Sequence, residues 1–240
     1  MTSLAPCGLD GLYGSGLVCD GEGAPLRPGG LALTERLIDL AGFRPGDRVA
    51  DAGCGQGASV ALMRTRGIRA LGVDAHSAPL ALARARSDAG AFLVAEGDRL
   101  PFASASLDGL LSECSLSAMP DRRRALAEWF RVLRPGGRLA VSDVYARAYP
   151  LDGAGSMATS AVLAGAAIDA GFRILRFEDC SSVLAGWAAR FIFQYGSIEA
   201  LWGGACAPNA ETARQARPGY YFMILLKAAR NACATGGRHE

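Results

Sequence analysis

The stretch Arg48-Val-Ala-Asp-Ala-Gly-Cys-Gly-Gln-Gly57 decides the fold of this chain. Its first half predicts a short buried strand from Val49 to Ala52, and three glycines then make a tight turn before a helix that begins near Ala58. Backbone N–H groups point outward at such a junction of strand, turn and helix. Because any side chain in the turn would hold a ligand away from the backbone, the glycines indicate a binding site.

An acidic residue at the end of this strand narrows the kind of ligand. The carboxylate of Asp51 beside bare backbone suits a cationic ammonium better than a pyrophosphate, which favours S-adenosylmethionine over a dinucleotide. A nicotinamide-dependent oxidoreductase stays an alternative, because Gly53, Gly55 and Ala58 also satisfy the looser dinucleotide pattern. Asp51 counts against that alternative, and so does the absence of a Tyr-x-x-x-Lys motif, since Lys227 is the only lysine.

The composition is typical of a single globular domain in a reducing cytoplasm. The chain has 240 residues, of which 50% are hydrophobic, and this suits one domain with a large aliphatic core. The net charge is +2 and the arginines are spread along the chain, so nothing indicates a nucleic-acid partner. The seven cysteines form no C-x-x-C pair, and no segment resembles a signal peptide or a membrane span. We therefore expect a cytoplasmic monomer or homodimer without a metal site or a membrane partner.

Strands and helices alternate along the chain. After the first strand and helix, strands are expected over residues 68–74, 91–95, 107–112, 138–143, 172–177 and 220–227. Helices are expected over residues 31–41, 78–87, 121–133, 157–170 and 182–202. This alternation predicts an α/β fold, doubly wound and Rossmann-like, with a mostly parallel sheet and helices on both faces. Residues 1–30 are rich in glycine and proline and are expected to be a flexible lead-in, followed by a single domain over 31–230 and a tail over 231–240.

Four motifs follow one another at the expected spacing between these strands. They are Val49-Ala-Asp-Ala-Gly-Cys-Gly-Gln-Gly57, Leu71-Gly-Val-Asp74, Glu96-Gly-Asp-Arg-Leu-Pro-Phe102 and Leu133-Arg-Pro-Gly-Gly137. In this order they resemble the class I S-adenosylmethionine-dependent methyltransferases, and most closely the small-molecule branch (methyltransferase type 11) that includes ubiquinone/menaquinone and arsenite methyltransferases. The resemblance covers residues 31–145 best. It implies a seven-stranded sheet with an antiparallel last strand, and methyl transfer to a small-molecule acceptor by in-line displacement.

The resemblance also implies where the cofactor S-adenosyl-L-methionine binds. Asp51 and the glycine turn would hold its methionine part, and Asp74 would accept hydrogen bonds from both ribose hydroxyls. Asp98 would accept from the exocyclic amine of adenine, while the backbone N–H of Arg99 meets a ring nitrogen. The implied cofactor-binding residues are Asp51, Gly53, Cys54, Gly55, Gly57, Asp74, Ala75, Gly97, Asp98, Arg99 and Glu113.

The acceptor side shows no committed catalytic group, so the catalytic residues stay unknown. Cys114, Asp143 and Tyr145 lie at or beyond strand ends and are candidates to touch the substrate. Tyr13 in the lead-in is a candidate to close over the cofactor, together with the aromatic helix over 182–202. A dedicated base is not required, because in-line displacement from a sulfonium depends mainly on alignment and on exclusion of water.

Two further alternatives stay open at this point. Several cysteines could converge as thiolate ligands for a soft metalloid such as arsenite. However, arsenite enzymes are expected to carry a cysteine after the fifth strand, and residues 144–171 contain none. The other alternative is a non-catalytic protein that keeps the S-adenosylmethionine pocket as a sensor.

Overall fold

Helices and strands alternate along the chain as the sequence predicts. The computed structural model describes residues 27–148, 157–195, 211 and 215–229. The strands are β1 (Arg48–Ala52), β2 (Arg69–Asp74), β3 (Phe92–Val94), β4 (Leu107–Glu113), β5 (Leu133–Ala146), β6 (Arg173–Asp179) and β7 (Pro218–Leu226). The helices are α2 (Gly30–Ala41), α3 (Ala58–Thr65), α4 (Ser77–Arg86), α5 (Arg122–Val132), α6 (Ser160–Asp169) and α7 (Ser181–Tyr195), with short 3₁₀ turns η1 (Ala89–Ala91) and η2 (Leu116–Ala118).

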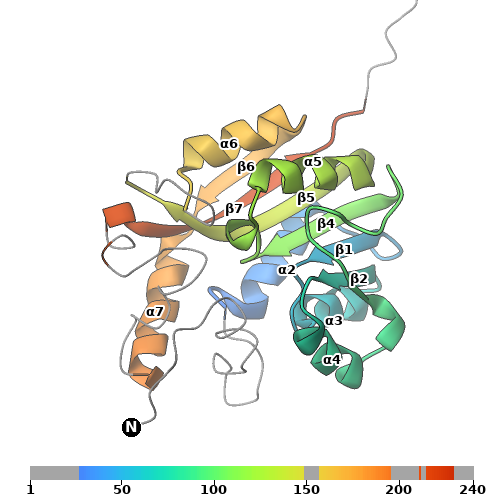
Figure 1. Ribbon diagram of the computed structural model, residues 1–240, viewed down its shortest axis with the longest axis horizontal. Coiled ribbons are helices and arrows are strands. Elements are labelled where there is room, and N and C mark those ends of the chain that lie inside the picture. The colour runs from blue at the N-terminus through green and yellow to red at the C-terminus, as the bar shows by residue number, and fades with distance from the viewer. Residues whose placement is uncertain (1–26, 149–156, 196–210, 212–214, 230–240) are drawn as a thin grey trace, which may run out of the picture.

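The strands form one seven-stranded sheet in the order β3-β2-β1-β4-β5-β7-β6 (Figure 1). β1 to β5 are mutually parallel, whereas β7 inserts antiparallel between β5 and β6. The predicted Rossmann-like sheet with an antiparallel last strand is therefore confirmed. The chain order reverses between β1 and β4, and ligands bind at such a switch point beyond the carboxyl ends of the strands.

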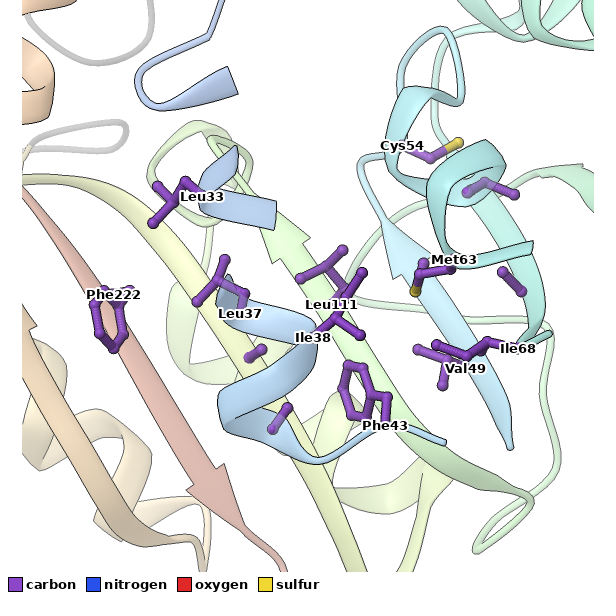
Figure 2. Packing of buried hydrophobic residues seen from close by; sticks show 14 of the residues in the cluster. Leu33, Leu37, Ile38, Phe43, Val49, Cys54, Met63, Ile68, Leu111 and Phe222 are labelled. Atoms are coloured by element: carbon purple, nitrogen blue, oxygen red, sulfur yellow. The ribbon is translucent and has the colours of Figure 1, made fainter. Parts of the chain in front are cut away.

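Each face of the sheet carries its own hydrophobic core. α2, α3, α4 and α7 cover one face, and α5 and α6 cover the other. Figure 2 shows the first core, in which Ile38 of α2 lies beside Leu111 of β4, and Met63 of α3 lies near Val49 of β1. These side chains explain the helix-period pattern of α2 and the burial of Val49 in β1, because each element is covered by a neighbour.

Element boundaries differ from the prediction in two instructive places. The expected turn over 134–137 lies inside β5, where a shift in the pairing with β4 absorbs the extra residues. The helix expected over 157–170 begins only at Ser160, because Thr159 caps it with its side-chain oxygen. The part of helix 182–202 beyond Tyr195 lies outside the described residues.

The only lysine has a structural position. The Nζ atom of Lys227 donates to the carbonyl oxygens of Phe130, at 2.6 Å, and Leu133, at 2.7 Å. These carbonyls lie at the end of α5, where an ammonium group satisfies otherwise unpaired acceptors and matches the helix dipole. Among the described helices, none is long and apolar enough to cross a membrane.

Candidate cofactor site

In the glycine turn after β1, two of the three glycines face packed neighbours and the third faces open space. All three have positive φ: 83° at Gly53, 52° at Gly55 and 80° at Gly57. A Cβ on Gly53 would lie 2.4 Å from Cβ of Ser115, and one on Gly57 would lie 2.7 Å from the ring of Phe92. A Cβ on Gly55 would meet nothing within 4 Å. Gly53 and Gly57 therefore allow close packing, and Gly55 is the position at which a ligand can approach the backbone.

Asp74 lies at the same edge, at the carboxyl end of β2. One carboxylate oxygen accepts from the backbone N–H of Gly55 at 2.8 Å, and the other accepts from the backbone N–H of His76 at 2.9 Å. The His76 ring nitrogen Nδ1 lies 3.2 Å from the second oxygen. Each carboxylate oxygen can accept more than one hydrogen bond, so Asp74 is held in place while it retains capacity for a diol. Ala75, predicted beside it, is exposed at the start of the following turn.

The loop after β3 is held by side chains of α5. Asp98 forms an ion pair with Nε of Arg124 at 3.1 Å. The carbonyl oxygen of Gly97 accepts from the indole N–H of Trp129 at 2.8 Å. The backbone N–H of Arg99 donates to the carbonyl oxygen of Glu96 at 3.0 Å, so in this structure that donor is already used within the loop. Trp129 and Arg124 belong to the framework of the site.

A buried polar network joins three elements next to the turn. Oε2 of Glu113, at the end of β4, accepts from the hydroxyls of Ser59 at 2.9 Å and Thr34 at 3.0 Å. It also lies 3.2 Å from Nη2 of Arg27, which precedes α2. Glu113 thus ties the starts of α2 and α3 to the sheet. The prediction that Glu113 belongs to the site stays a prediction, and its visible role is to hold these elements.

Asp51 is buried beside this network, and its surroundings raise the pKa of its carboxyl group. Its side chain is 3% exposed, and burial together with the neighbouring carboxylates of Glu113 and Asp74 raises its pKa to about 8, although Arg27 opposes the rise. Burial alone would lower the pKa of Arg27, but the carboxylates of Glu113 and Asp51 outweigh it and raise that pKa. One buried guanidinium thus serves two buried carboxylates, which leaves room for a second cation near Asp51.

The cysteines of the site are held as thiols. Cys54 is buried, and its Sγ would lie 2.7 Å from a Cβ on Gly72 of β2, so it packs against the sheet. Sγ of Cys114 lies 2.9 Å from the hydroxyl of Tyr220 on β7. Burial raises the pKa of both thiols. Among the described residues, no group of three His, Cys, Asp or Glu side chains could hold a metal ion.

Two of the predicted substrate contacts are packed inside the protein. Asp143 is 2% exposed, and its carboxylate accepts from the backbone N–H and the hydroxyl of Ser117, each at 2.7 Å. Tyr145 is 6% exposed and makes edge-on ring contacts with Phe177 and Tyr221. Both side chains thus have structural roles, and their burial gives no support to a contact with substrate. Tyr13 lies outside the described residues.

Comparison with known proteins agrees with this geometry. The family model described as "Methyltransferase domain" matches residues 50–141. The 27-O-demethylrifamycin SV methyltransferase of Amycolatopsis mediterranei is 36% identical over 145 residues, which are 56% of this chain and 53% of that protein. O-methyltransferase rstn1 of Aspergillus nomiae is 35% identical over 180 residues, which are 66% of this chain and 80% of that protein. The chain belongs to the class I S-adenosylmethionine-dependent methyltransferase family.

The family assignment covers the fold, but it does not by itself give the reaction. This methyltransferase-family chain spans about half the length of several curated relatives that it matches. Among solved structures, the [4+2]-cyclase SpnF is 25% identical, with a TM-score of 0.68 over 82% of this chain and 81% of that one. The same fold therefore also occurs in a protein described by a different reaction, so the chemistry has to be argued from the site.

Proposed function

We propose that this chain binds S-adenosylmethionine at the carboxyl edge of β1, β2 and β4 and transfers its methyl group to a small-molecule acceptor. The observation that carries the proposal is the open space at Gly55 beside the carboxylate of Asp74, which interacts electrostatically with buried Asp51. Asp74 accepts from the backbone N–H of Gly55, and Asp51 is buried with a pKa of about 8. A ligand with a diol at one end and an ammonium at the other matches both carboxylates.

In this proposal, each part of the ligand is bound by different residues. Asp74 takes the ribose hydroxyls, the loop around Asp98 holds the adenine, and Gly55 lets the chain between them lie against the backbone. Asp51 meets the ammonium of the methionine part. When bound, S-adenosylmethionine supplies a methyl group on a sulfonium: the acceptor forms a bond to the methyl carbon as the carbon–sulfur bond breaks and its electron pair goes to sulfur. The protein contributes alignment and a site shielded from water.

An oxygen atom is the acceptor that the relatives favour. Two of them are named for O-methylation, the rifamycin enzyme and rstn1. We therefore assign a hydroxyl of a small organic molecule as the attacked group. Its proton passes to solvent water as the oxygen–carbon bond forms, and the products are a methyl ether and S-adenosylhomocysteine.

The experiment that tests the proposal has a binding part and a turnover part. Calorimetry should show that S-adenosylmethionine and S-adenosylhomocysteine bind in the micromolar range and that NADH does not. Incubation with a panel of phenols and aliphatic alcohols should then release S-adenosylhomocysteine only with accepted compounds, and mass spectrometry should show the added methyl group. Binding of NADH in place of S-adenosylhomocysteine would contradict the proposal.

A second candidate follows from the similarity to SpnF. A chain of this fold that binds S-adenosylmethionine but consumes none would act on its organic ligand in another way, as that cyclase does by name. The two candidates separate in the turnover assay, because only methyl transfer converts S-adenosylmethionine into S-adenosylhomocysteine. Among the described residues, Cys54, Cys114 and Cys180 do not gather into a metal-binding group. Cys7, Cys19 and Cys206, which the metalloid alternative also needs, lie outside the described residues.

A further inference from the structure

A pocket of about 460 Å³ lies at the amino ends of β1 and β2, the edge of the sheet opposite the glycine turn. Three arginines line it, Arg48, Arg64 and Arg69, together with one carboxylate, that of Asp88. The other lining residues are apolar or glycine. Three guanidinium groups against one carboxylate leave two positive charges, as many as the whole 240-residue chain carries at neutral pH. This amino-edge pocket therefore attracts anions.

The pairing of β1 with β2 brings two of these arginines side by side. Arg48 and Arg69 are partners in the parallel register, and neighbouring strands lie about 5 Å apart. Like charges this close repel one another, and an anion between them would remove the repulsion. Asp108 offsets only part of it. Its carboxylate attracts Arg69 and accepts from the backbone N–H of Arg48 at 2.7 Å, but it also accepts from Nε of Arg134 at 2.5 Å, so its single charge is shared with a third arginine.

Both guanidinium groups of this pair are positioned by the protein and keep donors for a ligand. Among the described residues, the Arg48 guanidinium has no hydrogen-bond or ion-pair partner, and it lies over the Phe102 ring, 5.7 Å from the ring centre. A guanidinium stacked on a ring keeps its N–H groups available. Arg69 is held by one bond, from Nε to the carbonyl oxygen of Gly46 at 2.7 Å, which leaves both Nη groups without a partner in the described chain.

A phosphate group matches this pair better than a carboxylate does. Guanidinium groups bind phosphate oxygens with two parallel donors, and a phosphate monoester offers three acceptor oxygens and about two negative charges. A carboxylate carries a single charge, so it would leave half of the pocket's charge unmatched. We infer that the amino-edge pocket is a second ligand site, which binds the phosphate group of a small molecule between Arg48 and Arg69.

The remaining walls of the pocket contact the uncharged part of this ligand. Ile68 and Leu71 supply apolar surface next to the arginine pair. Arg64 already pairs through Nη2 with Asp88 at 3.0 Å, so its charge is balanced without a ligand. The length of β1, about 13 Å between its first and last residues, separates this pocket from the glycine turn. The second site therefore binds its ligand independently of the proposed function.

The test titrates anions into the chain in the absence of S-adenosylmethionine. Calorimetry measures the dissociation constants of inorganic phosphate, phenyl phosphate and benzoate, with potassium chloride keeping the ionic strength constant. The variants are Arg48→Met, Arg69→Met and Arg69→Lys. Arg123→Met is a matched control, because it removes the charge of an exposed arginine on α5 that pairs with Asp169.

The parent chain and Arg123→Met should bind phenyl phosphate about 10-fold more tightly than inorganic phosphate, because the ring buries apolar surface in the pocket. Both should bind benzoate more weakly than phenyl phosphate. Arg48→Met and Arg69→Met should each weaken phenyl phosphate by about 10- to 100-fold, the range for lost charge-assisted hydrogen bonds. Arg69→Lys should lie between the parent chain and Arg69→Met, since an ammonium keeps the charge without the paired donors.

A merely non-specific attraction between anions and a basic surface would give another pattern. Benzoate would then bind as tightly as phenyl phosphate, or Arg123→Met would lose as much affinity as Arg69→Met. Either result would overturn the inference, and so would a parent chain that binds neither phosphate at millimolar concentration. The proposed function would stand in each of these cases, because its own test uses S-adenosylhomocysteine, which is expected to bind at the opposite edge of the sheet.

Discussion

Protonation of Asp51 should control the affinity for S-adenosylhomocysteine. Asp51 is buried and faces Glu113 from β4, Asp74 from β2 and Arg27 from the segment before α2, and its pKa rises to about 8. With that pKa, about one tenth of the ligand-free molecules carry an ionised Asp51 at pH 7 and about one hundredth at pH 6. Only the ionised form attracts the ligand's ammonium, and each tenfold loss of that form costs about 1.4 kcal/mol of binding free energy.

The expected result is a dissociation constant that falls about 50-fold between pH 6 and pH 8. Binding should also release a proton, about 0.9 per ligand at pH 7. Calorimetry in buffers with different heats of ionisation measures this release directly. The ligand itself offers a control, since 5′-methylthioadenosine has no ammonium and should show neither effect.

Two variants separate Asp51 from other groups that titrate. Asp51→Asn should bind S-adenosylhomocysteine weakly and with no dependence on pH in this range. Asp39→Asn, which changes an exposed carboxylate on α2, should behave as the parent chain does. If the parent chain binds equally well at pH 6 and pH 8 and releases no proton, Asp51 is ionised in the free site and the electrostatic argument fails.

Three further outcomes follow from the same geometry. Gly55→Val should abolish S-adenosylhomocysteine binding in calorimetry while the chain still folds. Gly57→Val should lower the melting temperature, because its side chain would clash with the Phe92 ring. The opposite pattern would mean that the roles of the two glycines are exchanged. Asp74→Ala should weaken binding by about 1.5–3 kcal/mol per lost charge-assisted hydrogen bond, and unchanged binding would exclude it as the ribose ligand. The raised pKa of Asp51 means that the folded chain holds a proton between about pH 4 and about pH 8 that the unfolded chain has lost, so this group makes folding less favourable as the pH rises through that window. Asp51→Asn should therefore melt at a higher temperature than the parent at pH 8 and approach it at pH 5, as scanning calorimetry would show.

Most of the fold could be predicted from local patterns. α2 is recognisable because its buried residues repeat every 3.6 positions. β1 is recognisable because the short segment Val49–Ala52 comes directly before the glycine turn. The insertion of β7 between β5 and β6 is different, because no local pattern reveals which strands pair; it entered as an implication of the family resemblance. The bulge inside β5 also escaped prediction, since Pro135 and Gly136 have the composition of a turn whether or not the chain around them is paired.

The sequence predicts which turns lie at the carboxyl edge of the sheet, but it does not predict the side-chain network beside them. Gly55, Asp74 and Asp98 follow strands and could be placed at the carboxyl edge from spacing. Arg27 could not be predicted as part of the site, because the segment around it is rich in glycine and proline and carries no motif. Thr34 did offer a signal in the sequence. A polar residue on the buried face of an amphipathic helix indicates a buried hydrogen-bond partner, and Glu113 is that partner.

The position of Lys227 has a practical consequence. Reagents that attack amines find only this side chain and the chain's α-amine, because the chain has no other lysine. Nζ of Lys227 is held by two carbonyl oxygens and lies 4.5 Å from the centre of the Phe130 ring. The α-amine also has the lower ordinary pKa, so near neutral pH an amine-selective dye should mark the amino terminus alone. A single fluorophore at that end would then report, without any engineered cysteine, how the distance between the terminus and the three tryptophans of the chain changes when ligand is added.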